Sequence, residues 1–465
     1  MRNTSTRPKT AAPWASSPLQ TLAAGIVVFA LQWMHGPADA FVYDAAQYWE
    51  GALALLNGGD VTGAGVLEMR GALSPLVYLL PALVTTALGP WAAAWSVLAW
   101  NALLAVVLLV VLIPRIAEQI TPGRRTARVW VSALLGGIVL SGFARFPLLD
   151  VWSVTIALAG LYALLVGRRW FTLAAGGLAL AVAVNLRPSY LVPVMIAAIV
   201  LLIARPRHVV WAAPGAAFGA SAQALFNITV FGQLSFSPVA TPLLLRVQAA
   251  QATYGVRYDT VVSGEQHPQQ WYCDPAYAGL LLDDHVPTGP LDVVMSAVSH
   301  LPQSLWFLSE KASSSLFWTF GTPYEPAPGA GLGAMTIAVV AVAAFGVVAL
   351  IWRLIINWSI RATRLHALAL LGFWFGALGT LVFATPETRF ALPLVLVGLI
   401  GLLVAPPAAA WGDGSRRSAI VALAAAVALS GCLLLIGESG LDHPVPPGPL
   451  ADADSCAELT APSGR

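Results

Sequence analysis

Charged residues are scarce in this chain. Only 10% of its 465 residues are Asp, Glu, Lys or Arg, whereas 58% are hydrophobic and the mean hydropathy is +0.76. Soluble globular proteins carry about 25% charged residues, so the composition excludes an ordinary soluble protein. The net charge of +2 is too small to indicate a nucleic-acid partner. The sequence therefore predicts a polytopic membrane protein.

Common nucleotide and metal motifs are also missing. The chain has no GxxxxGK[ST] sequence, no HExxH, and no GxGxxG between an expected strand and helix. Asp452 and Asp454 form a DxD-like pair, but they lie in a polar tail. Standard zinc-site spacing is not met by the candidate ligands of one long connection, which are His267, Cys273, Asp274 and His285. We predict no certain cofactor, and a divalent cation is the alternative left open.

Cysteine is rare as well. Three cysteines are too few for a disulfide framework. Cys432 lies inside an apolar run and is expected to be buried. Cys273 and Cys456 would pair only if both face an oxidising compartment, and the sequence leaves that pairing open.

Long apolar runs are what the chain has in abundance. A membrane-spanning helix needs roughly 17–25 apolar residues, and many runs approach or reach that length. They lie near 18–35, 72–89, 91–113, 129–143, 151–166, 170–184, 189–204, 209–231, 333–352, 366–384, 390–406 and 418–436. The first run follows a basic stretch and is interpreted as a retained helix, not a cleaved signal peptide.

Arginine clusters in short loops orient these runs, because basic loops face the cytoplasm. They place the N-terminus inside and the connection 232–332, with eight acidic residues against three basic ones, outside. The stretch 71–113 holds two apolar runs, although it joins an outer loop to an inner loop and must therefore cross the membrane an odd number of times. Pro75 and Pro81 interrupt the first run, so one run is expected to be partial.

We therefore predict an all-α, polytopic bundle of about eleven crossings (about ten to thirteen), with the N-terminus inside and the C-terminus outside. An outer loop region carries interfacial helices, one of them expected within 301–320 because of its aromatic residues. The predicted divisions are a cytoplasmic tail (1–17), an N-terminal membrane module (18–231) with catalytic outer loops (36–70 and 144–150), the loop region (232–332), C-terminal membrane helices (333–436) and a polar tail (437–465).

Four arginines break the positive-inside pattern at the outer boundary. They are Arg70, Arg145, Arg187 and Arg389, and each adjoins an apolar run. Ionisable groups at membrane depth usually mark a function or a pair, and a guanidinium fork suits phosphate. Together they predict an anionic lipid headgroup as ligand. Three of them have a simpler alternative: Arg145 either snorkels to the interface or pairs with Asp150, Arg389 pairs with Glu387, and Arg70 pairs with Glu68.

The outer carboxylates supply a candidate base. In FVYDAAQYWE, residues 41–50, Asp44 and Tyr48 are four apart and share one face of an expected interfacial helix. A carboxylate there can accept a proton from an acceptor hydroxyl, unless Asp44 merely caps or solvates the helix. Asp150 is expected to cap a helix, or to join Asp44 in binding a divalent cation. Glu387 either orients Arg389 or binds the acceptor.

Five short segments, taken in order, resemble the GT-C superfamily of polytopic glycosyltransferases, which contains protein mannosyltransferases and lipid A aminoarabinose transferases. Asp44 is similar to the acid of the first outer loop, and Asp150 to the carboxylate of the second. Phe390 stands where a tyrosine is usual in the family's Glu-x-Arg-Tyr element. The segments are DAAQYWEGALAL (44–55), RGALSPLVYLLPAL (70–83), FARFPLLDVWSVTIAL (143–158), NLRPSYLVPV (185–194) and PETRFALPLVL (386–396).

The resemblance implies a hexosyl- or pentosyltransferase that uses a polyprenyl-phosphate sugar outside the cytoplasm, in a bacterial plasma membrane. Asp44 would be the base of an inverting transfer to a glycan, lipid or protein acceptor. Arg187, Arg389 and Arg70 would bind the donor phosphate, with Asp150, Glu387, Tyr48 and Arg145 in support. Two alternatives stay open: a lipid or solute transporter (flippase), and an inactive assembly subunit, because Ala45 stands where some members have a second acid.

Overall fold

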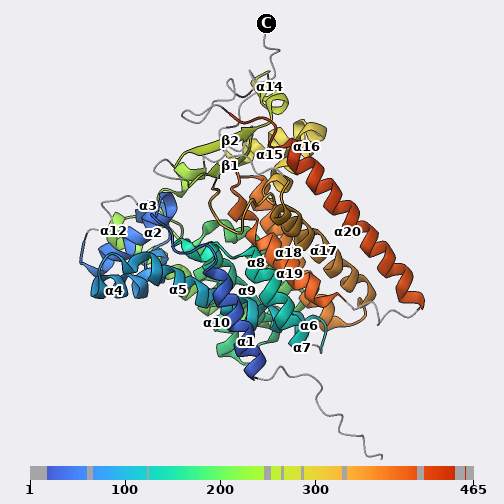
Figure 1. Ribbon diagram of the computed structural model, residues 1–465, viewed down its shortest axis with the longest axis horizontal. Helices are drawn as coiled ribbons and strands as arrows, with labels where there is room; N and C mark the ends of the chain where they lie inside the picture. The colour runs from blue at the N-terminus through green and yellow to red at the C-terminus, as the bar shows by residue number, and fades with distance from the viewer. Residues whose placement is uncertain are drawn as a thin grey trace, which may run out of the picture.

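The computed structural model describes residues 18–59, 66–122, 125–245, 253–262, 267–283, 287, 289–326, 332–405, 413–445 and 456. Within these residues the protein is almost entirely helical, and one two-stranded sheet lies at one end of the helix bundle (Figure 1). The predicted all-α architecture is confirmed at this coarse level.

The helices follow one another with short connections. The N-terminal half contains α1 (Pro18–Gln32), α2 (Tyr43–Leu56), α3 (Val66–Met69), α4 (Leu79–Leu88), α5 (Ala92–Val106), α6 (Ile113–Ile120), α7 (Arg125–Val131), α8 (Gly137–Val139), α9 (Asp150–Val166), α10 (Trp170–Leu186), α11 (Leu191–Ala204) and α12 (Pro206–Phe231). The C-terminal half contains α14 (Pro275–Asp283), α15 (Pro290–Ser299), α16 (Leu301–Ser314), α17 (Ala334–Ile356), α18 (Arg361–Val382), α19 (Leu392–Val404) and α20 (Asp413–Ser439). Short 3-10 or π segments are η1 (Ser74–Tyr78), η2 (Val107–Leu112), η3 (Ser132–Gly136), η4 (Phe143–Arg145), η5 (Pro188–Tyr190) and η6 (Thr388–Ala391).

Several helices are long and apolar enough to cross a membrane. By length and composition, five stretches among the described residues qualify: Ala92–Ile120, Pro206–Phe231, Ala334–Ile356, Arg361–Val382 and Arg416–Ser439. Seven further apolar helices are shorter. The chain is therefore a membrane protein, while the count of eleven crossings stays a prediction.

The interrupted run in 71–113 has a simple shape. Its first part is η1 followed by α4, and together Ser74–Leu88 form a short apolar helix. At 1.5 Å per residue such a segment spans only about 22 Å, less than the roughly 30 Å hydrocarbon core. The second part is a continuous helical stretch from Ala92 to Ile120. This contrast agrees with one partial segment before one full-length helix.

Helix α19 forms the centre of the bundle. Nearly all of its residues are buried, as expected for a helix that is apolar on every side. Glycines let it approach α17 closely, because a Cβ on Gly346 would lie 1.9 Å from the Gly398 carbonyl oxygen. A Cβ on Gly401 would likewise lie 2.0 Å from the Gly346 oxygen. Small residues at such contacts are typical of membrane helix packing.

A β-hairpin caps one end of the bundle (Figure 1). Strand β1 (Gly255–Thr260) pairs antiparallel with β2 (Gln269–Cys273), and Tyr258 lies opposite Trp271. The C-terminal segment returns to this hairpin, where the Val445 N–H donates to the Trp271 carbonyl at 2.9 Å. A disulfide joins Cys273 to Cys456. The described part of the predicted polar tail is thus packed on the loop region, and the pairing left open by the sequence is present.

Two local predictions need correction. A helix in 301–320 is present, but it ends at Ser314, and Phe317 and Trp318 are fully buried instead of lying at an interface. Trp318 packs against the Phe143 ring, 5.3 Å between ring centres, and donates to the Ser315 and Thr388 carbonyls, while the Phe317 ring lies against Gly437 of α20. Cys432 was expected to be buried and is exposed, because α20 packs on the bundle along only a small part of its surface.

Candidate functional site

Asp44 is held by two arginines from distant parts of the chain. It lies in the first turn of α2, and Arg70, just after α3, donates to its Oδ1. Arg389 of η6 donates from Nη2 to Oδ2 at 2.8 Å. The Asp44 side chain remains 21% exposed, so the carboxylate is reachable although both of its oxygens are bonded. The site therefore begins as one carboxylate between two guanidinium groups.

A second carboxylate adjoins the first pair. Asp150, at the start of α9, accepts a bond from Arg187, which follows α10. The Nη1 atom of Arg389 lies 3.7 Å from Asp150 Oδ2. Arg389 thus stands between Asp44 and Asp150 and links the two ion pairs. Three of the four predicted boundary arginines meet here, carried by separate elements.

Arg389 is oriented from behind by Glu387. The Nε of Arg389 donates to one oxygen of Glu387, and the Thr260 hydroxyl donates to the other. Glu387 and Thr260 are almost fully buried. The predicted orienting role of Glu387 therefore has a geometric basis, whereas Thr260 went unnoticed because it belongs to a long loop with no motif.

Aromatic rings surround the guanidinium groups. The Arg187 guanidinium lies 4.5 Å from the ring centre of Phe390, the residue that stands where the resemblance has tyrosine. Arg389 lies 5.4 Å from the Tyr324 ring, and Arg70 lies 5.6 Å from Tyr48. Such contacts stabilise cations in a site with little water. The sequence identified Tyr48 as a neighbour of Asp44, but it gave no signal for Tyr324.

Arg145 does not belong to this cluster. Its guanidinium donates to the Pro37 carbonyl at 3.3 Å and lies over the Phe146 ring. The alternative pairing of Arg145 with Asp150 is absent, because Asp150 is occupied by Arg187 and faces Arg389. Among the described residues, no contact between Arg145 and the arginine–carboxylate cluster supports its predicted role.

The predicted pairing of Arg70 with Glu68 and the predicted capping role of Asp150 are both absent, whereas Arg389 does pair with Glu387. Arg70 bonds Asp44, and Glu68 is exposed. Asp150 is the first residue of α9, whose N-cap position is Leu149 without a side-chain cap bond. Asp150 was expected to cap this helix, and it instead turns its carboxylate toward arginines because an ion pair with them is the stronger interaction for a buried acid.

The electrostatics of the site follow from these contacts. Burial alone would raise the pKa of Asp44, but Arg70, Arg389 and Arg187 outweigh it and lower that pKa to about 2. Burial raises the pKa of Glu387, even though Arg389 and Thr260 favour its ionised form. Asp44 is therefore ionised at neutral pH, and the neighbouring arginines make it a weak base.

The residues do not fit the divalent cation that Asp44 and Asp150 were considered to bind. Both carboxylates already accept bonds from guanidinium groups, whose positive charge opposes a cation nearby. No group of three or more His, Cys, Asp or Glu side chains suited to a metal occurs among the described residues. Cys273 is in a disulfide and cannot serve as a zinc ligand, while His285, Asp452 and Asp454 lie outside the described residues.

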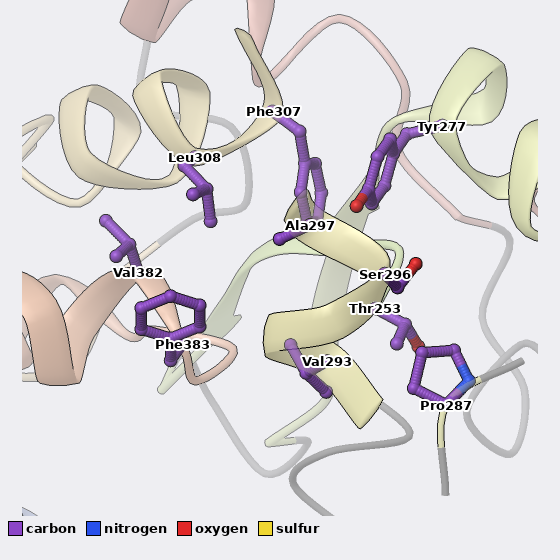
Figure 2. A pocket seen from close by; sticks show the side chains of 10 residues that line it. All are labelled: Thr253, Tyr277, Pro287, Val293, Ser296, Ala297, Phe307, Leu308, Val382 and Phe383. Atoms are coloured by element: carbon purple, nitrogen blue, oxygen red, sulfur yellow. The ribbon is translucent and has the colours of Figure 1, made fainter. Parts of the chain in front are cut away.

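A small apolar cavity lies elsewhere, between α15, α16 and the end of α18 (Figure 2). Phe307 and Leu308 of α16 face Val382 and Phe383 across it. Its volume is ≈ 10 Å³, about the room that one water needs. None of the charged residues described above lines it, so it is separate from the arginine–carboxylate cluster.

No protein-family model matches the chain, and no curated protein or solved structure matches it either.

Proposed function

We propose that the protein is an inverting glycosyltransferase of the GT-C type, which transfers a hexosyl or pentosyl group from a polyprenyl-phosphate donor to a glycan, lipid or protein acceptor. The observation that carries the proposal is the convergence of Arg70, Arg187 and Arg389 on Asp44 and Asp150. Guanidinium groups favour phosphate oxygens, and an ionised carboxylate beside them can accept a proton.

The reaction uses these groups in complementary ways. The acceptor hydroxyl attacks the anomeric carbon as the bond from that carbon to the phosphate oxygen breaks, and the electron pair leaves with polyprenyl phosphate. Asp44 takes the hydroxyl proton. Arg70, Arg187 and Arg389 stabilise the charge that develops on the departing phosphate, with Glu387 orienting Arg389 and Tyr48 contacting Arg70.

Donor binding also has a consequence for the base. When a phosphate recruits Arg70, Arg187 and Arg389, Asp44 loses charges that lower its pKa. The carboxylate then becomes a stronger base at the moment when the donor is in place. This coupling would limit unproductive proton transfer in the absence of donor.

The proposed location is the outer face of a bacterial plasma membrane, with about eleven crossings, an inner N-terminus and membrane lipids around the bundle. The Cys273–Cys456 disulfide supports this topology. It requires the loop region and the C-terminal segment to share one compartment, and disulfides persist mainly outside the cytoplasm. The odd number of crossings follows from an inner start and an outer end.

The test is sugar transfer by the purified protein in liposomes, with labelled polyprenyl-phosphate sugars and a panel of cell-envelope acceptors. Asp44→Asn should abolish product, whereas the matched control Glu50→Gln, an exposed acid of the same helix, should keep it. Equal product from Asp44→Asn and wild type would remove Asp44 as the base. Accumulation of substrate in the liposomes without covalent product would favour the transporter. Co-purification of the protein with a larger complex, with no functional effect of Asp44→Asn, would favour the inactive assembly subunit.

A further inference from the structure

Strand β1 has two differently engaged faces, because successive side chains of a strand point to opposite sides. On one face, Arg257 donates to Asp259 at 2.6 Å and to the Ser314 and Phe317 carbonyls at 2.7 and 3.0 Å. Arg257 and Asp259 are fully buried. These bonds fasten β1 to the C-terminal end of α16.

The other face of β1, and its edge away from β2, meet the segment that carries Arg389. Along the edge, the Tyr258 N–H donates to the Pro386 carbonyl at 3.1 Å, and on the face the ring centres of Tyr258 and Phe390 lie 6.4 Å apart. Two residues later, the Thr260 hydroxyl donates to Glu387, and both of these side chains are at most 3% exposed. The strand is therefore fixed on one side by the core and reaches, on its other side, the carboxylate that orients Arg389.

We infer that Thr260 is a positioning residue for Arg389, an inference that rests on the proposed function. By bonding one oxygen of Glu387, Thr260 sets the rotation of that carboxylate and leaves its other oxygen facing Arg389 Nε. Arg389 is then held with its Nη atoms toward Asp44 and Asp150. Thr260 acts only through Glu387 and Arg389. Without the hydroxyl, the Glu387 carboxylate loses the bond to one of its oxygens, and the direction of the guanidinium that it orients is less well fixed.

The first test measures the affinity of the full-length protein in nanodiscs for farnesyl phosphate by calorimetry. Thr260→Val, which keeps the shape of the side chain, should weaken binding about tenfold, because a hydrogen bond to a charged group is lost. Thr260→Ser should restore the wild-type affinity. Thr363→Val is the matched control, since the Thr363 hydroxyl is also buried but bonds the Ile120 carbonyl near the start of α18, at the end of that helix remote from Glu387.

A double-mutant cycle separates positioning from a general structural effect. In an Arg389→Ala background, Thr260→Val should produce no further loss of farnesyl phosphate affinity, because the group that it positions is gone. Independent losses that add in the double variant would overturn the inference. So would an unchanged affinity of Thr260→Val in the wild-type background.

A second measurement does not depend on ligand binding. Hydrogen exchange of the Arg389 Nε–H can be followed by NMR in protein labelled with ¹⁵N-arginine, with the signal assigned by its loss in Arg389→Lys. Thr260→Val should accelerate this exchange about tenfold or more, and unchanged exchange would overturn the inference. If the wild type fails to bind farnesyl phosphate, the proposed function fails, and the exchange rates still decide the role of Thr260.

Discussion

Arg389 donates a hydrogen bond to Asp44 over 2.8 Å, although 345 positions separate the two residues in the chain. The same guanidinium faces Asp150 and is bonded from behind by Glu387. Three arginines face three carboxylates in this cluster, so every charge in it is balanced by an opposite charge. The phosphate of the proposed donor would have to compete with these carboxylates for the arginines, which would favour a strongly anionic ligand.

Replacement of Arg389 should lower the turnover of a saturating donor. Arg389→Lys keeps the charge but loses the planar fork, and we expect a rate loss of about 10²–10³-fold for loss of one such stabilising contact. Steady-state kinetics with labelled polyprenyl-phosphate sugar measures this loss of turnover. Arg145→Lys is the control, because Arg145 lies at the same boundary but outside the cluster, and its rate should stay near that of the wild type. A full rate in Arg389→Lys would contradict the assigned role.

Loss of the disulfide should destabilise the loop region. Cys456→Ser opens a loop closed across 183 positions and leaves the C-terminal segment attached to β2 by backbone hydrogen bonds. Removal of a native disulfide typically costs about 2–5 kcal/mol of the free energy of unfolding. We expect a lower thermal midpoint and earlier proteolysis of the hairpin. Cys432→Ser, at an exposed position on α20, should leave the thermal midpoint unchanged, and the same result for Cys456→Ser would contradict the prediction.

Stability should fall as pH rises because of Glu310. Burial and nearby Asp274 raise the pKa of Glu310 to about 7, although Ser439 and Trp306 donate hydrogen bonds to it. Since a free glutamate has a pKa of about 4.3, the folded state binds more protons between about pH 4 and 7, so its stability decreases across that window.

Glu310→Gln should remove this part of the pH dependence while keeping an oxygen for Trp306 and Ser439. The thermal midpoint should be measured at pH 5 and at pH 8 for both proteins. The change in midpoint between these two pH values should be smaller in the variant than in the wild type, by roughly 2–4 °C. The variant should be the more stable protein at pH 8. An identical pH dependence of the two proteins would assign the effect to other groups.

The contact between α17 and α19 should not tolerate a methyl group. In Gly346→Ala the new Cβ would meet backbone of Gly398, which cannot move aside as a side chain does, and overpacking of this kind costs about 1–3 kcal/mol. We expect a lower thermal midpoint in detergent. Gly379→Ala in α18 is the control, because no atom lies within 4 Å of its added Cβ. Equal midpoints for both variants would contradict the close approach.

Composition and hydropathy were sufficient to establish a helical membrane protein, because apolar runs of this length have no other stable environment. The sequence also located the boundary arginines and Asp44, since charges next to apolar runs stand out. What these residues do stays a prediction. Only the tertiary structure decided the partners. Arg70 pairs with Asp44 instead of Glu68, and Asp150 pairs with Arg187 instead of capping a helix. Arg145 does not pair with Asp150 and bonds the Pro37 carbonyl.

The contacts of the β1–β2 hairpin could not be predicted from the sequence, because they too join residues that are far apart in the chain. Thr260, Tyr258 and Tyr324 lie in a connection whose local pattern carries no motif, and their roles arise from contacts with residues far along the chain. Burial of Trp318 and exposure of Cys432 likewise depend on which surfaces other helices cover. Hydropathy reports the preference of a segment for an apolar environment, but packing decides whether that environment is protein or lipid.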